Sequence, residues 1–175
     1  MTTMETTETQ PQSPMTKPEP QKEHRWLQQL VGEWTFEGEA MMGPDASPAK
    51  FNGKESVRSL GGLWFLAEGE GGMPEGGTSS TIATLGYDPQ KKRFVGTFIG
   101  SMMTNLWVYD GALDAAEKVL TLDTEGPSMA GDGTMAKYKD IIEIKSNDQR
   151  TLTSRVQGSD GQWTQIMTMT YRRTK

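Results

Sequence analysis

The sequence predicts an all-β protein: an up-and-down antiparallel β-barrel of about ten strands, preceded by a short helix. From Glu33 onward, apolar and polar residues alternate with period two, as in strands that have one buried face. Turn residues separate the alternating segments, and none of the intervals is long enough for a crossover helix, so the connections are hairpins. Closure of the sheet would remove its two exposed edges. A β-sandwich of two sheets is the alternative.

The first 22 residues form a predicted disordered tail. Residues 1–22 are mostly Thr, Glu, Gln and Pro and lack aromatic and β-branched aliphatic residues, so they bury too little surface to offset the entropy of ordering. They also lack the apolar run of a secretory signal. Residues 23–175 are predicted to form one barrel domain, which suits the total length of 175 residues.

A helix is predicted at the start of this domain. Trp26, Leu27, Leu30 and Val31 have the spacing of one helical face, and Gly32 ends the pattern. The strands are predicted near residues 33–40, 51–59, 63–70, 80–87, 93–102, 105–110, 118–125, 135–145, 150–157 and 162–172. Five of the turns between them are predicted at Gly61-Gly62, Asp88-Pro89, Asp110-Gly111, Asn147-Asp148 and Asp160-Gly161.

Composition excludes several functions. The chain has no cysteine, so disulfides, thiolate metal sites and cysteine nucleophiles are absent. Its net charge of −5 argues against general attraction to nucleic acid or to anionic membranes. No segment has the roughly 20 apolar residues that span a bilayer. We therefore predict a soluble, cytoplasmic protein with no nucleic-acid or membrane partner.

The one histidine, His24, lies in the predicted helix. A Ser-His-Asp triad or a multi-histidine metal site inside the barrel is thus excluded, and we predict no catalytic residue and no metal ligand. His24 is expected to be an exposed residue at the start of the helix; a pH-sensitive lid contact is the alternative.

Some polar residues share their strand face with large apolar ones and are therefore expected to point into the barrel. Asp140 alternates with Tyr138 and Ile142, Glu55 aligns with Phe51 and Val57, and Gln165 aligns with Trp163 and Met167. A charge inside a barrel requires a partner or water, so Glu55 and Asp140 indicate either internal pairing, with Arg155 as one partner, or a polar set that orients a ligand.

Large apolar side chains supply the remaining candidates for a binding site. Aromatic walls around a few polar groups are typical of small-molecule pockets. Methionines in the barrel region are either an adaptable lining or core filler. The predicted ligand-binding residues are Trp34, Glu55, Trp64, Trp107, Tyr138, Asp140, Trp163 and Gln165, and the methionines are Met102, Met103, Met129, Met135, Met167 and Met169.

Two further features near residue 70 have both a functional and a structural interpretation. The glycine-rich run 69–77 lacks the features of a phosphate loop, so it is either a plain hairpin connection or a flap at the barrel mouth. Glu68 and Glu70 have the spacing of a paired acid and base, but the same spacing marks a solvated strand face.

Several motifs resemble an uncharacterised, mainly bacterial family, domain of unknown function 1579, which is lipocalin-like and belongs with the calycin barrels. They are Trp26 to Trp34, Glu55 to Trp64, Thr84 to Asp88, and Gly100 to Met103 with Leu106 to Tyr109, and the resemblance covers about 24–173. It implies a short helix followed by a closed barrel and transfers no reaction. Related barrels that carry haem hold the iron with a histidine. Because His24 lies outside the strands, we predict no haem and no other cofactor.

We therefore expect a non-catalytic barrel that binds a small, mostly apolar molecule in its interior. One alternative is an isomerase- or hydrolase-type enzyme that uses Asp140 or Glu55 as a base. Another is an interaction module that forms a homodimer, because segments 95–99 and 106–108 are apolar on both faces.

Overall fold

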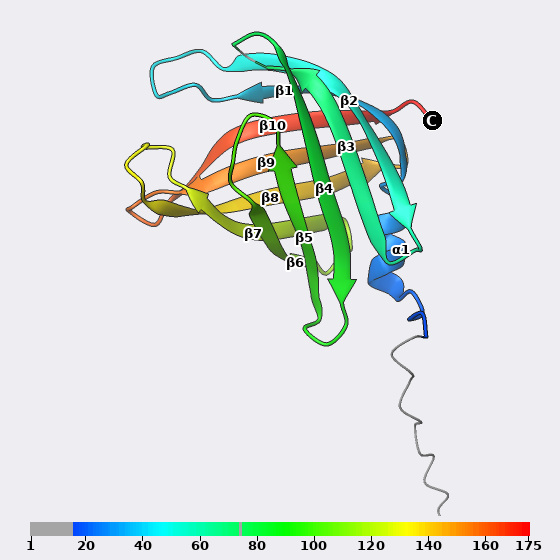
Figure 1. Cartoon of the computed structure of the whole chain (residues 1–175). Coiled ribbons are helices and arrows are strands. Elements are labelled where there is room, and N and C mark those ends of the chain that lie inside the picture. The colour runs from blue at the N-terminus through cyan, green and yellow to red at the C-terminus, as the bar shows by residue number, and fades with distance from the viewer. Residues whose placement is uncertain (1–15, 74) are drawn as a thin grey trace, which may run out of the picture.

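Pairing of the first strand with the last closes the sheet. In the computed structural model, which describes residues 16–73 and 75–175, ten antiparallel strands pair in chain order and β1 pairs with β10 (Figure 1). This confirms the up-and-down barrel with a short N-terminal helix and excludes the sandwich. The predicted tail lies outside the described residues up to residue 15, and Lys22 already belongs to the helix.

The elements lie close to their predicted ranges. They are α1 (Lys22–Gln28), β1 (Gly32–Ala40), β2 (Ala49–Leu60), β3 (Trp64–Gly72), β4 (Thr78–Asp88), β5 (Arg93–Gly100), β6 (Trp107–Leu113), β7 (Val119–Pro127), β8 (Met135–Ser146), β9 (Gln149–Gln157) and β10 (Trp163–Arg173).

The barrel has two different ends. In Figure 1, α1 lies at one end, where β1 begins, and the loops that follow β1, β3, β5, β7 and β9 gather at the other. We call these the helix end and the open end. Trp26 and Leu27 of α1 are buried, and so is Leu30, two residues after its end. The Trp26 Nε1–H donates to the Glu117 carbonyl oxygen at 2.6 Å. The apolar stripe of α1 thus forms a floor at the helix end.

His24 belongs to this floor, and the expectation that it is exposed is wrong. Its side chain is 4% exposed, its Nδ1 accepts the Gln21 backbone N–H at 3.0 Å, and its ring packs edge-on against Tyr87. The hydrogen bond satisfies a backbone donor at the start of α1, which turns the ring back toward the helix N-terminus and into the protein.

The turn predicted at Asp110-Gly111 is also wrong, because both residues lie within β6. Gly111 is buried against β7, where a Cβ would come within 2.7 Å of the Leu122 side chain. The turn occurs four residues later, where the Asp114 carboxylate accepts the backbone N–H groups of Lys118 and Val119 at 2.9 and 3.0 Å. A strand glycine required by close packing was misread as a turn glycine.

A buried ion pair lies just above the floor. Arg150 is 3% exposed and its guanidinium pairs with the Glu55 carboxylate. The guanidinium carbon also lies 4.7 Å from the ring centroid of Trp34 and 3.8 Å from that of Tyr171. Glu55 thus has an internal partner, but it is Arg150; Arg155, the residue named from the sequence, is exposed.

Removal of the Glu55 charge is expected to destabilise the barrel. Glu55→Gln leaves the Arg150 charge buried without its counter-ion, so the free energy of unfolding should fall by about 3–5 kcal/mol. Urea denaturation followed by tryptophan fluorescence measures this change. Glu37→Gln, in the exposed pair with Arg172 at 3.0 Å, is the control and should cost less than about 1 kcal/mol. Equal losses for the two variants would contradict the prediction.

The turn at Asp114 should contribute a pH-dependent part of the stability. The backbone donors of Val119 and Lys118 lower the pKa of the Asp114 carboxyl below its ordinary value of 3.8. Its contribution is therefore complete above that value and is lost as the pH falls through the lower folded-state pKa. Titration of the Asp114 carboxyl carbon by NMR should give a midpoint below 3.8, and a midpoint at or above 3.8 would rule this account out.

Candidate functional site

The barrel encloses a cavity of about 350 Å³ that extends from the floor toward the open end. Its walls are predominantly apolar and come from both the β1–β5 and the β6–β10 sides. Representative wall residues are Phe36, Phe51, Phe65, Phe98, Ile142 and Met169. A ten-stranded barrel is wider than the roughly eight strands whose inward side chains can fill the interior, so space remains at its centre.

Glycines allow two of the large rings to lie against the wall. A Cβ at Gly53 would come within 2.5 Å of the Phe36 ring, and one at Gly126 within 2.2 Å of the Trp107 ring. Each ring therefore occupies the place that a side chain on the neighbouring strand would otherwise fill. This arrangement places aromatic surface on the cavity wall without filling the centre.

Four of the eight predicted site residues line the cavity: Glu55, Trp107, Tyr138 and Asp140. Trp107 and Tyr138 contact each other edge-to-face, with ring centroids 5.0 Å apart, and the Tyr138 hydroxyl donates to the Pro127 carbonyl oxygen at 2.5 Å. They form a pair of rings on the β6–β8 side of the cavity.

The other four predicted residues do not line it. Trp34 faces inward but is buried in the floor, where its Nε1–H donates to the Leu30 carbonyl oxygen at 2.9 Å. Trp64 is on the outer surface, 43% exposed, and its ring lies over the space left by Gly86 on β4. Its neighbour Phe65 faces inward instead. The prediction failed here because Trp64-Phe65-Leu66 is apolar throughout, so alternation does not identify the inner face.

Trp163 and Gln165 are also on the outside, so their predicted inward orientation is wrong. The pairing of β10 with β9 shifts between Gln165 and Met167, and the extra residue reverses the facing of all positions before it. Met167, Met169 and Tyr171 consequently face inward while the Trp163 ring lies under the Lys139 ammonium, 4.8 Å from it. Ile166, at the bulge, lines the cavity and had no signal in the sequence.

A polar cluster interrupts the apolar wall around Asp140. The Tyr109 hydroxyl donates to its Oδ2 and the Ser154 hydroxyl to its Oδ1, each at 2.5 Å. Desolvation raises the pKa of the Asp140 carboxyl, and the two hydroxyl donors oppose that rise. Burial and the nearby Asp140 carboxylate raise the pKa of Tyr109 well above its ordinary value, so its hydroxyl remains a donor.

Arg150, Ser154, Tyr109 and Thr124 are cavity residues that sequence reasoning did not single out. Parity offered a signal for all four, since Tyr109 shares its strand face with Trp107, Thr124 shares its face with Leu122, and Arg150 and Ser154 share theirs with Leu152. Thr124 is buried on β7, and its hydroxyl has no hydrogen-bond partner among the described residues.

Residues of the open end combine methionines with small residues. Met102 and Met103 line the cavity from the loop between β5 and β6, and the Trp107 Nε1–H points to the Met103 sulfur at 2.9 Å. Met167 and Met169 also line it, whereas Met129 and Met135 are 61% exposed and lie outside. In the glycine-rich run, β3 continues to Gly72, which leaves a short connection at 73–77, of which residue 74 lies outside the described residues.

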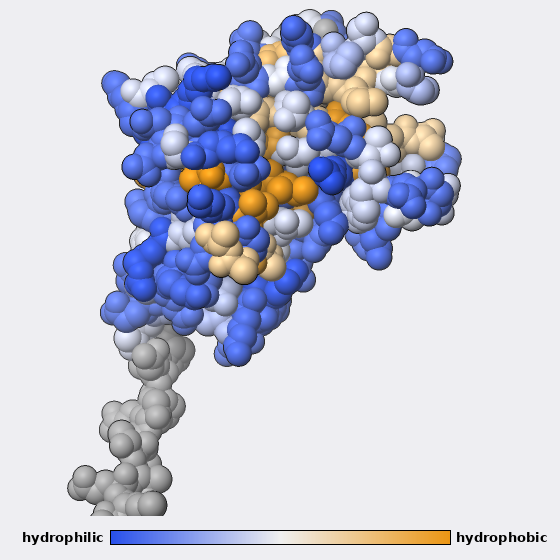
Figure 2. Space-filling model, turned by 180° about the vertical axis from the view of Figure 1, so that it is seen from behind, coloured by the Kyte–Doolittle hydropathy of each residue, from blue (hydrophilic) through white to orange (hydrophobic). Residues whose placement is uncertain are grey.

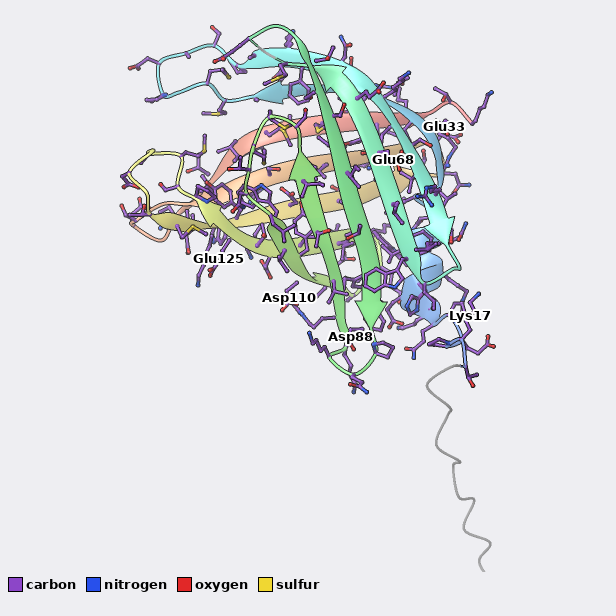
Figure 3. The ribbon with its side chains drawn as sticks, viewed as in Figure 1. Lys17, Glu33, Glu68, Asp88, Asp110 and Glu125 are labelled. Carbon is purple, nitrogen blue, oxygen red and sulfur yellow. The ribbon has the colours of Figure 1, made fainter. Side chains whose placement is uncertain are left out.

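The carboxylates near residue 70 are solvated. Glu68 lies on the outer side of β3 (Figure 3), 4.0 Å from Arg58. Glu70 lines the rim of the cavity, 3.7 Å from Lys54. Their pattern marks a wet strand face and supplies no acid–base pair inside the cavity.

The outer surface carries an exposed apolar row on β4, β5 and the start of β6. Ile82 pairs with Ile99, and Leu106 and Val108 continue the row; their exposed fractions lie between 41% and 59%. The row differs from the polar outer side expected of a barrel strand. Figure 2 shows the opposite, rear face, turned away from β4 and β5, which is mostly hydrophilic with a hydrophobic area near its centre.

Within residues 16–73 and 75–175, no three His, Cys, Asp or Glu side chains come together to hold a metal ion. His24 does not line the cavity. In the same part of the chain, no helix has the length and apolar character needed to cross a membrane.

Comparison with solved structures supports the barrel. The crystal structure of Rv2717c from M. tuberculosis is 12% identical, with a TM-score of 0.59, and the alignment covers 90% of this chain and 100% of that one. A redesigned β-barrel, mFAP1, bound to DFHBI, is 17% identical with a TM-score of 0.46, over 85% of this chain and 99% of that one. At such identities the likeness to Rv2717c is one of fold alone.

Comparison with curated protein sequences finds no match. A family model, "Protein of unknown function (DUF1579)", matches residues 19–173, a range that includes α1 and all ten strands. The chain, with its floor helix and its closed ten-stranded barrel, therefore belongs to the DUF1579 family.

Proposed function

We propose that this protein binds a small, mostly apolar molecule inside its barrel without transforming it. The observation that carries the proposal is the cavity of about 350 Å³, which is lined mainly by aromatic, aliphatic and methionine side chains and opens away from α1. Small-molecule sites commonly have volumes of about 300–1,000 Å³, apolar walls and a few convergent polar groups. The volume lies at the lower end of that range and favours a small ligand.

Binding is favoured over catalysis by the composition of the wall. Among the described residues that line the cavity there is no histidine or lysine, and the Ser154 hydroxyl donates to Asp140. A nucleophile with a separate base and an orienting group is therefore missing from this set. Asp140 is the residue on which an isomerase-type alternative would depend.

A cytoplasmic location, a calycin relationship and the lack of a nucleic-acid partner stay predictions.

Filling the cavity should abolish binding. Ala83 lines it on β4, so Ala83→Leu places three additional carbon atoms in the space that the ligand would occupy. Ala112→Leu makes the same chemical change at an exposed position of β6 and serves as the matched control. Tryptophan fluorescence during titration with neutral lipophiles such as octanol should change for the wild type and for Ala112→Leu, because Trp107 lines the cavity, and should stay constant for Ala83→Leu.

Native mass spectrometry of the purified full chain tests the same proposal without a chosen probe. A retained molecule of a few hundred daltons that is lost in Ala83→Leu would support it. Failure of the wild type both to retain a molecule and to respond to any lipophile would overturn it.

The exposed apolar row supports a second candidate function, self-association as a homodimer. Ile82, Ile99, Leu106 and Val108 form a continuous outer surface, and charges of both signs, Arg58 and Glu68, lie on the adjacent strands β2 and β3. A two-fold interface requires such self-complementarity.

If this surface joins two copies, substitution of Ile99 by a charge should separate them. Sedimentation at increasing concentration should give a dimer for the wild type and a monomer for Ile99→Lys. Thr170→Lys, on the outer face of β10, should remain dimeric. A wild type that stays monomeric throughout would eliminate this candidate.

A further inference from the structure

We propose that Asp140 selects the chemical class of the ligand: a mostly apolar molecule that carries a cationic amine or another strong N–H donor, in preference to a carboxylate. This inference rests on the proposed function and deepens it. It follows from the charges and hydrogen-bonding groups that the cavity wall leaves available.

The positive charge inside the barrel is already used. The Arg150 guanidinium pairs with Glu55 and lies between the rings of Trp34 and Tyr171. Its charge is therefore balanced by Glu55, although its buried Nε–H has no hydrogen-bond partner among the described residues. Glu70, the remaining acidic residue at the rim, is exposed and lies beside Lys54.

The negative charge at Asp140 has no cationic partner in the described part of the chain, because none of its ion pairs includes this residue. The nearest lysine along β8, Lys139, faces outward, where it lies 3.6 Å from Asp123 and over the Trp163 ring. Asp140 instead receives two neutral hydroxyl groups, from Tyr109 and Ser154. A cationic ligand in the cavity would supply the counter-ion that the protein does not provide for Asp140.

The wall around Asp140 also has hydrogen-bond acceptor positions that no donor of the protein occupies. An ionised carboxylate offers about four lone-pair positions, and only two are used. The buried hydroxyl of Thr124, which lies opposite Tyr138 on the adjacent strand β7, has no partner within the described residues and can accept a further hydrogen bond. An ammonium group, with three donors and no acceptor, suits such a surface.

The surroundings make this recognition selective. Leu122 lies opposite Asp140 in the β7–β8 register, and Ile142 is the next inward residue of β8. Charges interact strongly in a wall of low polarity, so a ligand carboxylate would meet like-charge repulsion there and an ammonium would meet attraction. The groups that donate to the carboxylate are the hydroxyls of Tyr109 from β6 and Ser154 from β9, and neither is a competing base. The other ionisable lining groups are Glu55, Glu70, Arg150, Tyr138 and Tyr171.

Three probes with one apolar body and different heads test the inference: octylamine, octanol and octanoic acid, titrated calorimetrically into the full chain near neutral pH. Octylamine should bind at least about tenfold more tightly than octanol, and octanoate more weakly than octanol. Asp140→Asn keeps the shape of the side chain and should remove the advantage of the amine, so that the ratio of octylamine affinity to octanol affinity falls to about one. Thr124→Val should weaken octylamine alone.

A measurement on the wild type keeps the inference testable if Asp140→Asn fails to fold. Octylamine stays protonated at neutral and acidic pH, so its affinity should fall as the pH falls through the ionisation of Asp140, whereas octanol affinity should not fall with it. Burial raises the pKa of this carboxyl, which moves the loss above the range of an ordinary aspartate.

The outcomes separate the two proposals. Equal binding of all three probes, or preference for octanoate, overturns the role of Asp140 and leaves the proposed function standing. Amine binding that survives in Ala83→Leu takes place outside the cavity and also overturns the inference. No binding of any probe, octanol included, contradicts both.

Discussion

The number of strands is the constraint on which the other features of this structure depend. A closed sheet of ten strands has a circumference larger than its own inward side chains can fill, since about eight strands already give an interior that side chains only just occupy. The free space cannot be removed by packing alone. It is closed at one end by α1, whose Trp26, Leu27 and the following Leu30 supply the apolar floor, and it remains as a cavity toward the other end.

Two ionisable centres inside this space are stabilised in different ways. The charge of Arg150 is balanced by that of Glu55, and its guanidinium is flanked by two aromatic rings, so the counter-ion comes from within the protein. Asp140 is held only by the hydroxyl groups of Tyr109 and Ser154. A buried charge without a counter-ion costs stability, and proteins usually accept such a cost where a group serves a function. The first centre therefore belongs to the architecture, and the second is the candidate for recognition.

The sequence predicted the barrel well because alternation and turn chemistry are local signals that repeat ten times. It predicted the inner face less well. Where alternation was clear, at Glu55 and Asp140, the inward side chains were identified; where Trp64 and Phe65 stood together, the wrong ring was chosen. The bulge before Met167 reversed Trp163 and Gln165, and no local pattern announces an unpaired residue. The Arg150 partner of Glu55 lies 95 positions away and depends on the closure of the barrel, which single-strand patterns do not encode.

Rigidity also differs between the two parts of the cavity. The hydroxyl donors of Asp140 come from β6 and β9, and Ser154 is its direct partner in the strand register, so backbone pairing fixes the polar cluster. The open end instead presents Met102 and Met103, whose unbranched side chains adapt to different shapes. A fixed polar group combined with an adaptable apolar surface discriminates strongly between ligand head groups and weakly between hydrocarbon bodies. The geometry thus favours a site that recognises a chemical class of ligand rather than one molecule.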